Sequence, residues 1–443
     1  MLHFIILLIS ILLIILTTTK WKWHPFLALL FVTVFYGIGT GIPTETILKT
    51  INEGFGGTIG SIGIIIIAGL IIGTFLEKSG GAQTLAHFLI NLIGEKRIHW
   101  AMGLIGYVVS IPVFADSGFI ILNPLNKALT KKAGVSLAGT AIALSMGLLC
   151  SHTMVPPTPG PIAAAAIINA DLGQVILFGL ITSLGALMVC IIFAKYMGSK
   201  IIIEAKVEES LADINEVAAP SVTKAFLPII VPILLIVLRS IANYPSQPFG
   251  ESQLVEVIQF LGNPMIALSI GMLLSFLLPK KFDRSMLGTY GWVGEALKSA
   301  AIIILITGAG GAFGKMIQVS GINTVIESNV QQISIGLLLP FLLSAIIKTA
   351  QGSSTVAIIT TASIILPMLM TLGLDDMTSK AMVVVAIGAG AAVVSHANDS
   401  FFWVVTQMTD MEVKQGYQLH SAASFVLGVS AFVILSFIRL LIG

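Results

Sequence analysis

Charged residues are scarce in this sequence. Asp, Glu, Lys and Arg make up 10% of its 443 residues, whereas about 25% is usual for a soluble domain. Apolar residues make up 56%, and the mean hydropathy of +1.00 reflects the whole chain rather than one hydrophobic segment. This composition excludes a soluble enzyme, a disordered regulator and a nucleic-acid-binding protein. It predicts an all-α polytopic membrane protein that lies in a lipid bilayer.

Cysteine and net charge are also low. The two cysteines, Cys150 and Cys190, both lie inside apolar segments, and their spacing matches neither a disulfide framework nor a metal site. The 23 basic and 21 acidic residues leave a net charge of +2, which gives no reason to expect a polyanionic partner. We therefore expect no metal, no cofactor and no nucleic acid.

Long apolar runs are what the sequence has in abundance. A helix needs about 20 mainly apolar residues to cross a bilayer. The first run lacks the basic start and the small-residue cleavage site of a secretion signal, so we expect it to be a retained helix. The candidate spans lie near residues 2–18, 25–43, 58–76, 99–127, 136–170, 174–196, 225–243, 255–278, 299–318, 332–370, 381–408 and 419–441.

Two of these runs, 99–127 and 332–370, are long enough to enter the membrane and fold back. Each has a polar tip in its middle, Phe-Ala-Asp-Ser-Gly at 114–118 in the first and Gln-Gly-Ser-Ser-Thr at 351–355 in the second. Polar groups left unpaired against lipid are very unfavourable. The sequence therefore predicts two re-entrant hairpins whose tips are buried in protein or line a water-filled cavity.

The order of these elements repeats along the chain. A pattern of Ile, Ala, Gly and Ser within 61–85 recurs 241 residues later, and a Ser-His pair follows each hairpin, at 151–152 and at 395–396. Internal duplication in a membrane chain is typical of secondary transporters. We expect two inverted-topology repeats joined by a linker, with the divisions 1–197, 198–224 and 225–443.

The positions of lysine and arginine predict the orientation. If Lys20 and Lys22 lie inside, most other lysines and arginines also lie inside, provided that both hairpins return to the side from which they start. The first hairpin then enters from the cytoplasm and the second from outside, as inverted repeats require. The linker is expected in the cytoplasm, and both termini on the external side of the cell inner membrane.

Two further runs contain a break at membrane depth. The run 136–170 includes four prolines between 156 and 161, and proline lacks an amide donor and clashes with the preceding helical turn. The run 381–408 includes the polar sequence Ser-His-Ala-Asn-Asp-Ser at 395–400. Half-helix ends inside a membrane attract ions, anions at the amino ends and cations at the carbonyl ends. Both broken helices are therefore candidates for the substrate site.

Five motifs carry a resemblance to a known family: Phe55-Gly56-Gly57-Thr58, the run 152–161, Gly308-Ala309-Gly310-Gly311-Ala312-Phe313, Gly352-Ser353-Ser354-Thr355-Val356-Ala357, and Ser395-His396-Ala397-Asn398-Asp399-Ser400. With these motifs the chain resembles the GntP family of gluconate permeases, in the ion transporter superfamily, over nearly its whole length. The resemblance implies proton symport of gluconate or a related sugar acid. It also implies a homodimer with a static scaffold and a mobile transport domain, which is an elevator-type mechanism of alternating access.

Two positions depart from the family pattern where substrate is expected. Many relatives have a second histidine in the proline run, where this chain has Thr158, and gluconate permeases commonly have a bulkier acidic tip than Ala115-Asp116-Ser117. The small, hydroxyl-rich lining favours an extended polyol acid such as gluconate. The alternatives are glycerate, D-serine or a keto-sugar acid as substrate, and sodium in place of protons as the coupling ion.

The polar residues of the tips and breaks form the candidate site. Asp116 and Asp399 are acidic at membrane depth, where such groups are usually functional, and His152 and His396 titrate near neutral pH. These four are the candidates for proton coupling. Lys348 is the expected countercharge for a substrate carboxylate, with a fixed pairing to Asp399 as the alternative. The substrate-binding candidates besides Lys348 are Asp116, Ser117, His152, Thr153, Thr158, Ser353, Ser354, Thr355, Asn398 and Ser400.

Two other classes of function fit the sequence less well. Ser151 beside His152 suggests a nucleophile and a base, but neighbouring residues on a helix point about 100° apart, and no third group orients them. No enzyme is therefore expected. A passive channel is disfavoured because a two-fold plan of broken helices is typical of alternating access.

Overall fold

The computed structural model describes residues 2–94, 97–205, 219–243, 249–250, 252–321 and 336–442. Every regular element in these ranges is a helix, which confirms the all-α prediction. Residues 206–218 of the predicted linker and residues 332–335 of the second predicted hairpin lie outside the described residues.

Six of the described helical segments are long and apolar enough to cross a bilayer, and a seventh span results if the pair α11 and α12, bent by 65°, counts as one. The chain is therefore a multi-pass membrane protein. These segments comprise α3 (Thr44–Lys78), α7 (Leu137–Met154) with α8 (Pro159–Ile168), α9 (Leu172–Gly198), α10 (Val222–Ala242), α11 (Gln253–Leu261) with α12 (Pro264–Ser275), the segment Arg284–Val319 that includes α13 (Trp292–Val319), and the segment Val413–Ile442 that includes α20 (Ala422–Ile442).

The other apolar runs are shorter helices or pairs of helices. The remaining elements in the described ranges are α1 (Leu2–Thr19), α2 (Pro25–Gly39), α4 (Gly81–Ile93), α5 (Ile98–Ser110), α6 (Ala115–Ala133), η3 (Arg284–Leu287), α15 (Leu338–Gln351), α16 (Ser354–Ile365), η4 (Leu366–Met368), α17 (Met377–Ala392), α18 (Ser400–Met408), α19 (Val413–Gly416) and η5 (Tyr417–Ser421).

Helix α3 differs most from its expected span. The sequence predicts a crossing at 58–76, but α3 is one uninterrupted helix of 35 residues. At 1.5 Å per residue it is about 52 Å long, and α13 packs along it. Gly54 of α3 and Gly311 of α13 allow this contact, since a Cβ at Gly311 would lie 2.0 Å from Thr58 Oγ1 and one at Gly54 would lie 2.7 Å from Ala312 Cα. A Cβ at Gly56 or Gly57 would meet no atom within 4 Å, so close packing accounts for the glycines of the 308–313 motif and not for those of the 55–58 motif.

The helix ends coincide with the polar tips and breaks of the sequence. Helix α5 ends just before the first tip and α6 begins at Ala115, while α15 ends at Gln351 and α16 begins at Ser354. The proline run separates α7 from α8, and residues 393–399 separate α17 from α18. These interruptions bring half-helix ends to the interior of the protein. The re-entrant path of the two tip segments through a membrane stays a prediction.

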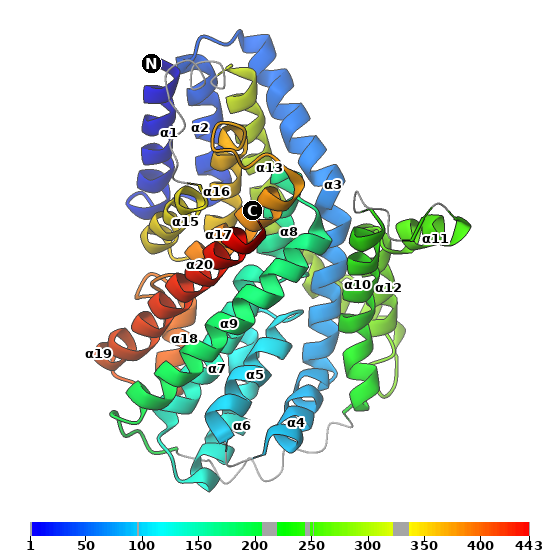
Figure 1. Cartoon of the computed structure of the whole chain (residues 1–443), viewed down its shortest axis with the longest axis vertical. Helices are drawn as coiled ribbons and strands as arrows, with labels where there is room; N and C mark the ends of the chain where they lie inside the picture. Colours follow the sequence, from blue (N-terminus) through cyan, green and yellow to red (C-terminus); the bar gives the residue numbers. More distant parts are fainter. Residues whose placement is uncertain are drawn as a thin grey trace.

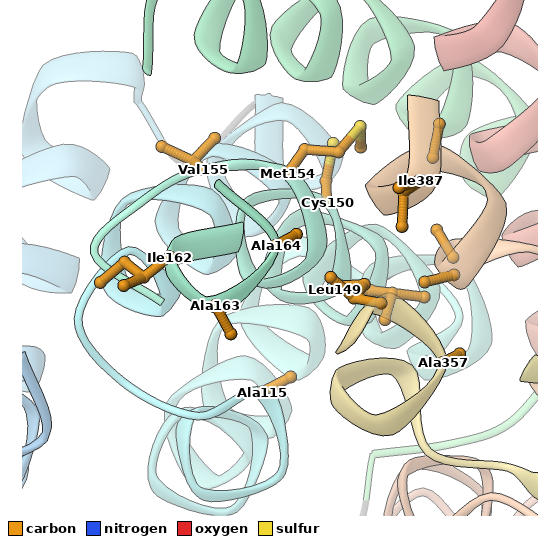
Figure 2. Packing of buried hydrophobic residues seen from close by; sticks show 14 of the residues in the cluster. Ala115, Leu149, Cys150, Met154, Val155, Ile162, Ala163, Ala164, Ala357 and Ile387 are labelled. Carbon is orange, nitrogen blue, oxygen red and sulfur yellow. The ribbon is translucent and has the colours of Figure 1, made fainter. Parts of the chain in front are cut away.

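The broken helices form the centre of the molecule. In Figure 1, α4, α5 and α6 lie toward the lower end and α1, α2, α15 and α16 toward the upper end, with α9 and α20 crossing obliquely between them. Figure 2 shows side chains of α6, α7, α8, α16 and α17 meeting in one apolar cluster, among them Leu149, Ala163 and Ile387. The apolar stretch of α7 and α8 is completely buried. This packing fixes the positions of the tips that the cluster surrounds.

Candidate functional site

A cavity of about 310 Å³ lies where the two tips, the end of α7 and the second helix break meet. Its walls come from residues 114–116 at the first tip, 351–355 at the second tip and 398–401 at the second break, together with Leu149 and His152 of α7. The structure thus brings both predicted tips and the Ser-His-Ala-Asn-Asp-Ser break to one place. The proline run contributes to this cavity only through the helix that precedes it.

Three helices begin at this cavity. Ala115, Ser354 and Ser400, the first residues of α6, α16 and α18, all line it. The first-turn N–H groups of a helix lack intrahelical acceptors and carry the positive end of the helix dipole. Two helices, α7 and α15, end at the same cavity with His152 in the last turn of one and Gln351 at the end of the other. Such an arrangement favours a small molecule with an anionic group at the amino ends.

Two buried polar atoms of the lining have no partner. Within the described residues, neither His152 Nδ1 nor Gln351 Nε2 makes a hydrogen bond, and the His152 ring lies 5.7 Å from the Phe114 ring between centroids. An unsatisfied buried polar group costs about 1–3 kcal/mol. Each atom has less than 1 Å² of accessible surface, so a molecule in the cavity can bond to it only if the lining side chains shift. Gln351 was not among the sequence candidates, although its position as the first residue of the second tip could have indicated it.

Most of the hydroxyl and amide candidates at the cavity already have hydrogen-bond partners within the protein. Ser353 caps α16 by accepting a bond from Val356 N, and Ser354 Oγ donates to the carbonyl of Ala391 at 2.9 Å. Asn398 Nδ2 donates to the carbonyls of Thr349 and Ala350. In the described part of the chain, Thr355 lines the cavity without a hydrogen bond from its side chain. Its hydroxyl is therefore available to a bound molecule.

Asp116 faces the cavity from the first turn of α6. Its Oδ2 accepts a hydrogen bond of 3.1 Å from Ser400 Oγ, which joins the start of α6 to the start of α18. No lysine or arginine of the described residues lines this cavity. A bound substrate would therefore meet two carboxyl groups and no basic side chain of these residues. The two are Asp116 and the mostly buried Asp399.

Lys348 and Asp399 form a buried ion pair. The ammonium group lies 2.5 Å from Asp399 Oδ2, and the lysine is 0% exposed. Lys348 Nζ also donates to the carbonyl of Gly352. Lys348 thus makes the pairing to Asp399 that the sequence left open as the alternative, and it does not line the cavity. Its role as countercharge for a substrate stays a prediction, and the helix amino ends are a second source of positive potential.

The ion pair extends into a network that reaches His420. Ser395 Oγ donates to Asp399 Oδ2 at 2.5 Å, and His420 Nε2 lies 3.1 Å from Ser395 Oγ. His420 is completely buried and belongs to the π-helical turn η5, an irregularity often found at functional sites. His420 is not among the residues predicted from the sequence. Its position near the start of the last apolar run could have indicated it.

Besides Lys348, four candidates are absent from the lining of the cavity. Ser117 lines a second cavity of about 200 Å³ between α3, α13 and the first tip. The hydroxyls of Thr153 and Thr158 bond to the backbone carbonyls of Leu149 and Val155. His396 Nε2 lies 2.8 Å from the carbonyl oxygen of Thr349. The last three therefore have local structural partners.

Similarity to known proteins extends over the whole chain. It is 33% identical over 446 residues to the gluconate permease of Pseudomonas aeruginosa, covering 98% of this chain and 97% of that protein. It is also 33% identical over 448 residues to the D-serine transporter DsdX of Escherichia coli, covering 98% of both chains. The crystal structure of the Alcanivorax borkumensis YdaH transporter superposes with a TM-score of 0.59 at 17% identity, covering 89% of this chain and 88% of that one.

These relatives and the fold indicate a transporter rather than an enzyme. A sequence profile described as GntP family permease matches residues 2–441. The fold likeness to a solved transporter agrees with the apolar helices and with a polar cavity built from helix ends inside an apolar core. The chain belongs to the GntP family of permeases.

Proposed function

We propose that the protein imports gluconate or a closely related sugar acid by proton symport, with the cavity at the two tips as its binding site. The observation that carries this proposal is a cavity at which three helices begin and whose lining includes hydroxyl, amide and imidazole side chains. The helix amino ends suit a carboxylate, while polar side chains such as Thr355 suit the hydroxyl groups of a polyol. The volume is at the low end of the range for small-molecule sites, about 300–1,000 Å³.

D-serine is the second candidate substrate. Asp116 faces the cavity as a carboxylate with Ser400 as its hydrogen-bond partner, and a carboxylate is the natural partner of an amino acid's ammonium group. The similarity to a D-serine transporter also supports D-serine as a candidate. A site that bonds several hydroxyls disfavours analogues that lack them, because its polar groups then stay unpaired. On this ground we favour the sugar acid.

Asp116 is the proposed carrier of the coupling proton. An anionic substrate bound beside this carboxylate is repelled unless the carboxyl group is protonated, so binding of substrate and proton would be coupled. Asp399 is less suited to this role, since its charge is compensated by Lys348. His152 lies at the same cavity and is the second candidate for the proton path.

Matched helix contacts support two inverted repeats. Helix α12 packs on α3 as α2 packs on α13, and α18 packs on α6 as α8 packs on α16. The two tip segments approach the cavity from opposite ends of the molecule (Figure 1). We propose that α3 and α13 belong to the static scaffold of a homodimer in the cell inner membrane, and that the tips and broken helices move together against it.

The proposed orientation predicts the labelling of single cysteines. A cysteine at Asp375, which is exposed ahead of α17, should react with an impermeant maleimide from outside the cell. A cysteine at Lys131, exposed in the last turn of α6, should react only after the membrane is opened. Labelling of intact and permeabilised cells tests this directly. External labelling at position 131 would contradict the inverted orientation of the repeats.

Uptake into membrane vesicles tests the proposed substrate and coupling. Radiolabelled gluconate should accumulate when the outside is more acidic than the inside and should only equilibrate without a pH gradient. Unlabelled gluconate should compete strongly, glycerate less, and D-serine poorly. Strong competition by D-serine with none by gluconate would mean that the substrate is the amino acid and not the sugar acid. Accumulation that follows a sodium gradient instead of the pH gradient would contradict proton coupling.

A further inference from the structure

The ammonium group of Lys348 joins the second tip to the second helix break. It donates to the carbonyl of Gly352 on the tip and lies 2.5 Å from Asp399 Oδ2 on the break, with no exposed surface. Removing two charges from water is costly unless the geometry compensates for it. A fully buried lysine in this position therefore requires an explanation beyond packing.

The backbone of the second tip is shaped to present its carbonyl to this cation. Gly352 has φ +88°, and a Cβ there would lie 2.1 Å from the carbonyl oxygen of Asn398. Only glycine fits this close approach of tip and break. The tip therefore stays against the break with the Gly352 oxygen directed at the Lys348 ammonium group.

The two oxygens that contact the ammonium are of kinds that also bind monovalent cations. They are a backbone carbonyl at the carbonyl end of α15 and the Asp399 carboxylate, which also accepts a bond from the Ser395 hydroxyl. In transporters with interrupted helices, unwound carbonyls and half-helix carbonyl ends coordinate sodium. The other titratable group of this network is His420, which reaches Asp399 only through Ser395.

We infer that the Lys348 ammonium is a tethered cation that occupies the place of a sodium ion between the second tip and the second break. This inference deepens the proposed function, because it assigns the site a built-in positive charge and makes bound sodium unnecessary there. It follows that removal of the ammonium leaves an oxygen-lined site with a net negative charge. Such a site should bind sodium from solution.

Thermal unfolding of the purified protein in detergent, without substrate, tests this inference. In sodium chloride the Tm of Lys348→Ala should be higher by about 3 °C or more than in choline chloride of equal ionic strength. The wild type should show no difference between the two salts. Lys348→Met, which fills the space and adds no ligand, should also show none, and neither should Lys348→Ala combined with Asp399→Asn.

Each remaining outcome overturns the inference. A Tm of Lys348→Ala that is equal in the two salts would do so, and so would an equal sodium response of the wild type. Failure of Lys348→Ala to fold even in sodium chloride would also count against it, because sodium should replace the missing ammonium. Since the readout needs no substrate, it is independent of whether gluconate is transported.

Discussion

Replacement of Thr355 by aspartate is expected to reduce gluconate uptake at least about 100-fold while the protein remains folded. Thr355 lies in the first turn of α16 and lines the cavity. An acidic residue at this end of a helix is favourable for the helix itself, so the fold should tolerate it. The same charge would repel a substrate carboxylate by about 4 kcal/mol at 4 Å in a medium of effective dielectric constant about 20. Initial rates of radiolabelled uptake measure the loss.

Thr355→Asn is the matched control, because it has nearly the shape of aspartate without the charge. It should retain most of the uptake, and both variants should unfold at temperatures close to that of the wild type. Equal uptake by the aspartate and asparagine variants would mean that no anion binds at the amino end of α16. The proposed position of the substrate carboxylate would then be wrong.

Replacement of Asp399 by asparagine is expected to destabilise the protein by about 3–5 kcal/mol, because it leaves the Lys348 charge buried without its partner. Asparagine is as good a helix N-cap as aspartate, so the bond from Phe401 N that caps α18 can persist. The loss of stability therefore reports the loss of the Asp399 charge and not the loss of the helix cap. Denaturation of the purified protein, followed by tryptophan fluorescence, measures the loss of stability.

Asp376→Asn provides a control of the same chemistry. Asp376 caps α17 by accepting a bond from Ser379 N, as Asp399 caps α18, but it is exposed. This variant should keep the stability of the wild type within experimental error. Combining Asp399→Asn with Lys348→Met should restore much of the stability, because no unpaired charge remains. An unaffected single variant would show that the ion pair contributes nothing to the folded state.

The sequence predicts the positions of the helix interruptions because they depend on local chemistry. Four prolines between 156 and 161 cannot continue a helix, and the polar tips at 114–118 and 351–355 cannot face lipid. The structure has helix ends at all of these places. The same reasoning selected Asp116, His152, Thr355 and other residues that line the cavity.

The partners inside the site depend on the fold and could not be predicted in the same way. Lys348 and Asp399 are 51 residues apart, and only the meeting of tip and break makes them an ion pair rather than two free charges. His420 enters the network from the π-helical turn η5, outside both motifs. Thr153 and Thr158 lie in the expected motif, but the helical geometry turns their hydroxyls to backbone carbonyls. A hydroxyl's partner depends on the fold as much as on the motif.

Substrate protection of a cysteine at position 353 tests most directly whether the cavity at the two tips is the binding site. Ser353 lines the cavity and is exposed within it, while the native Cys150 and Cys190 are buried. At low temperature, gluconate should slow the alkylation of Ser353→Cys by a maleimide several-fold and leave the alkylation of Lys131→Cys unchanged. An unchanged alkylation rate at position 353, at a gluconate concentration that saturates uptake, would show that gluconate does not bind in this cavity.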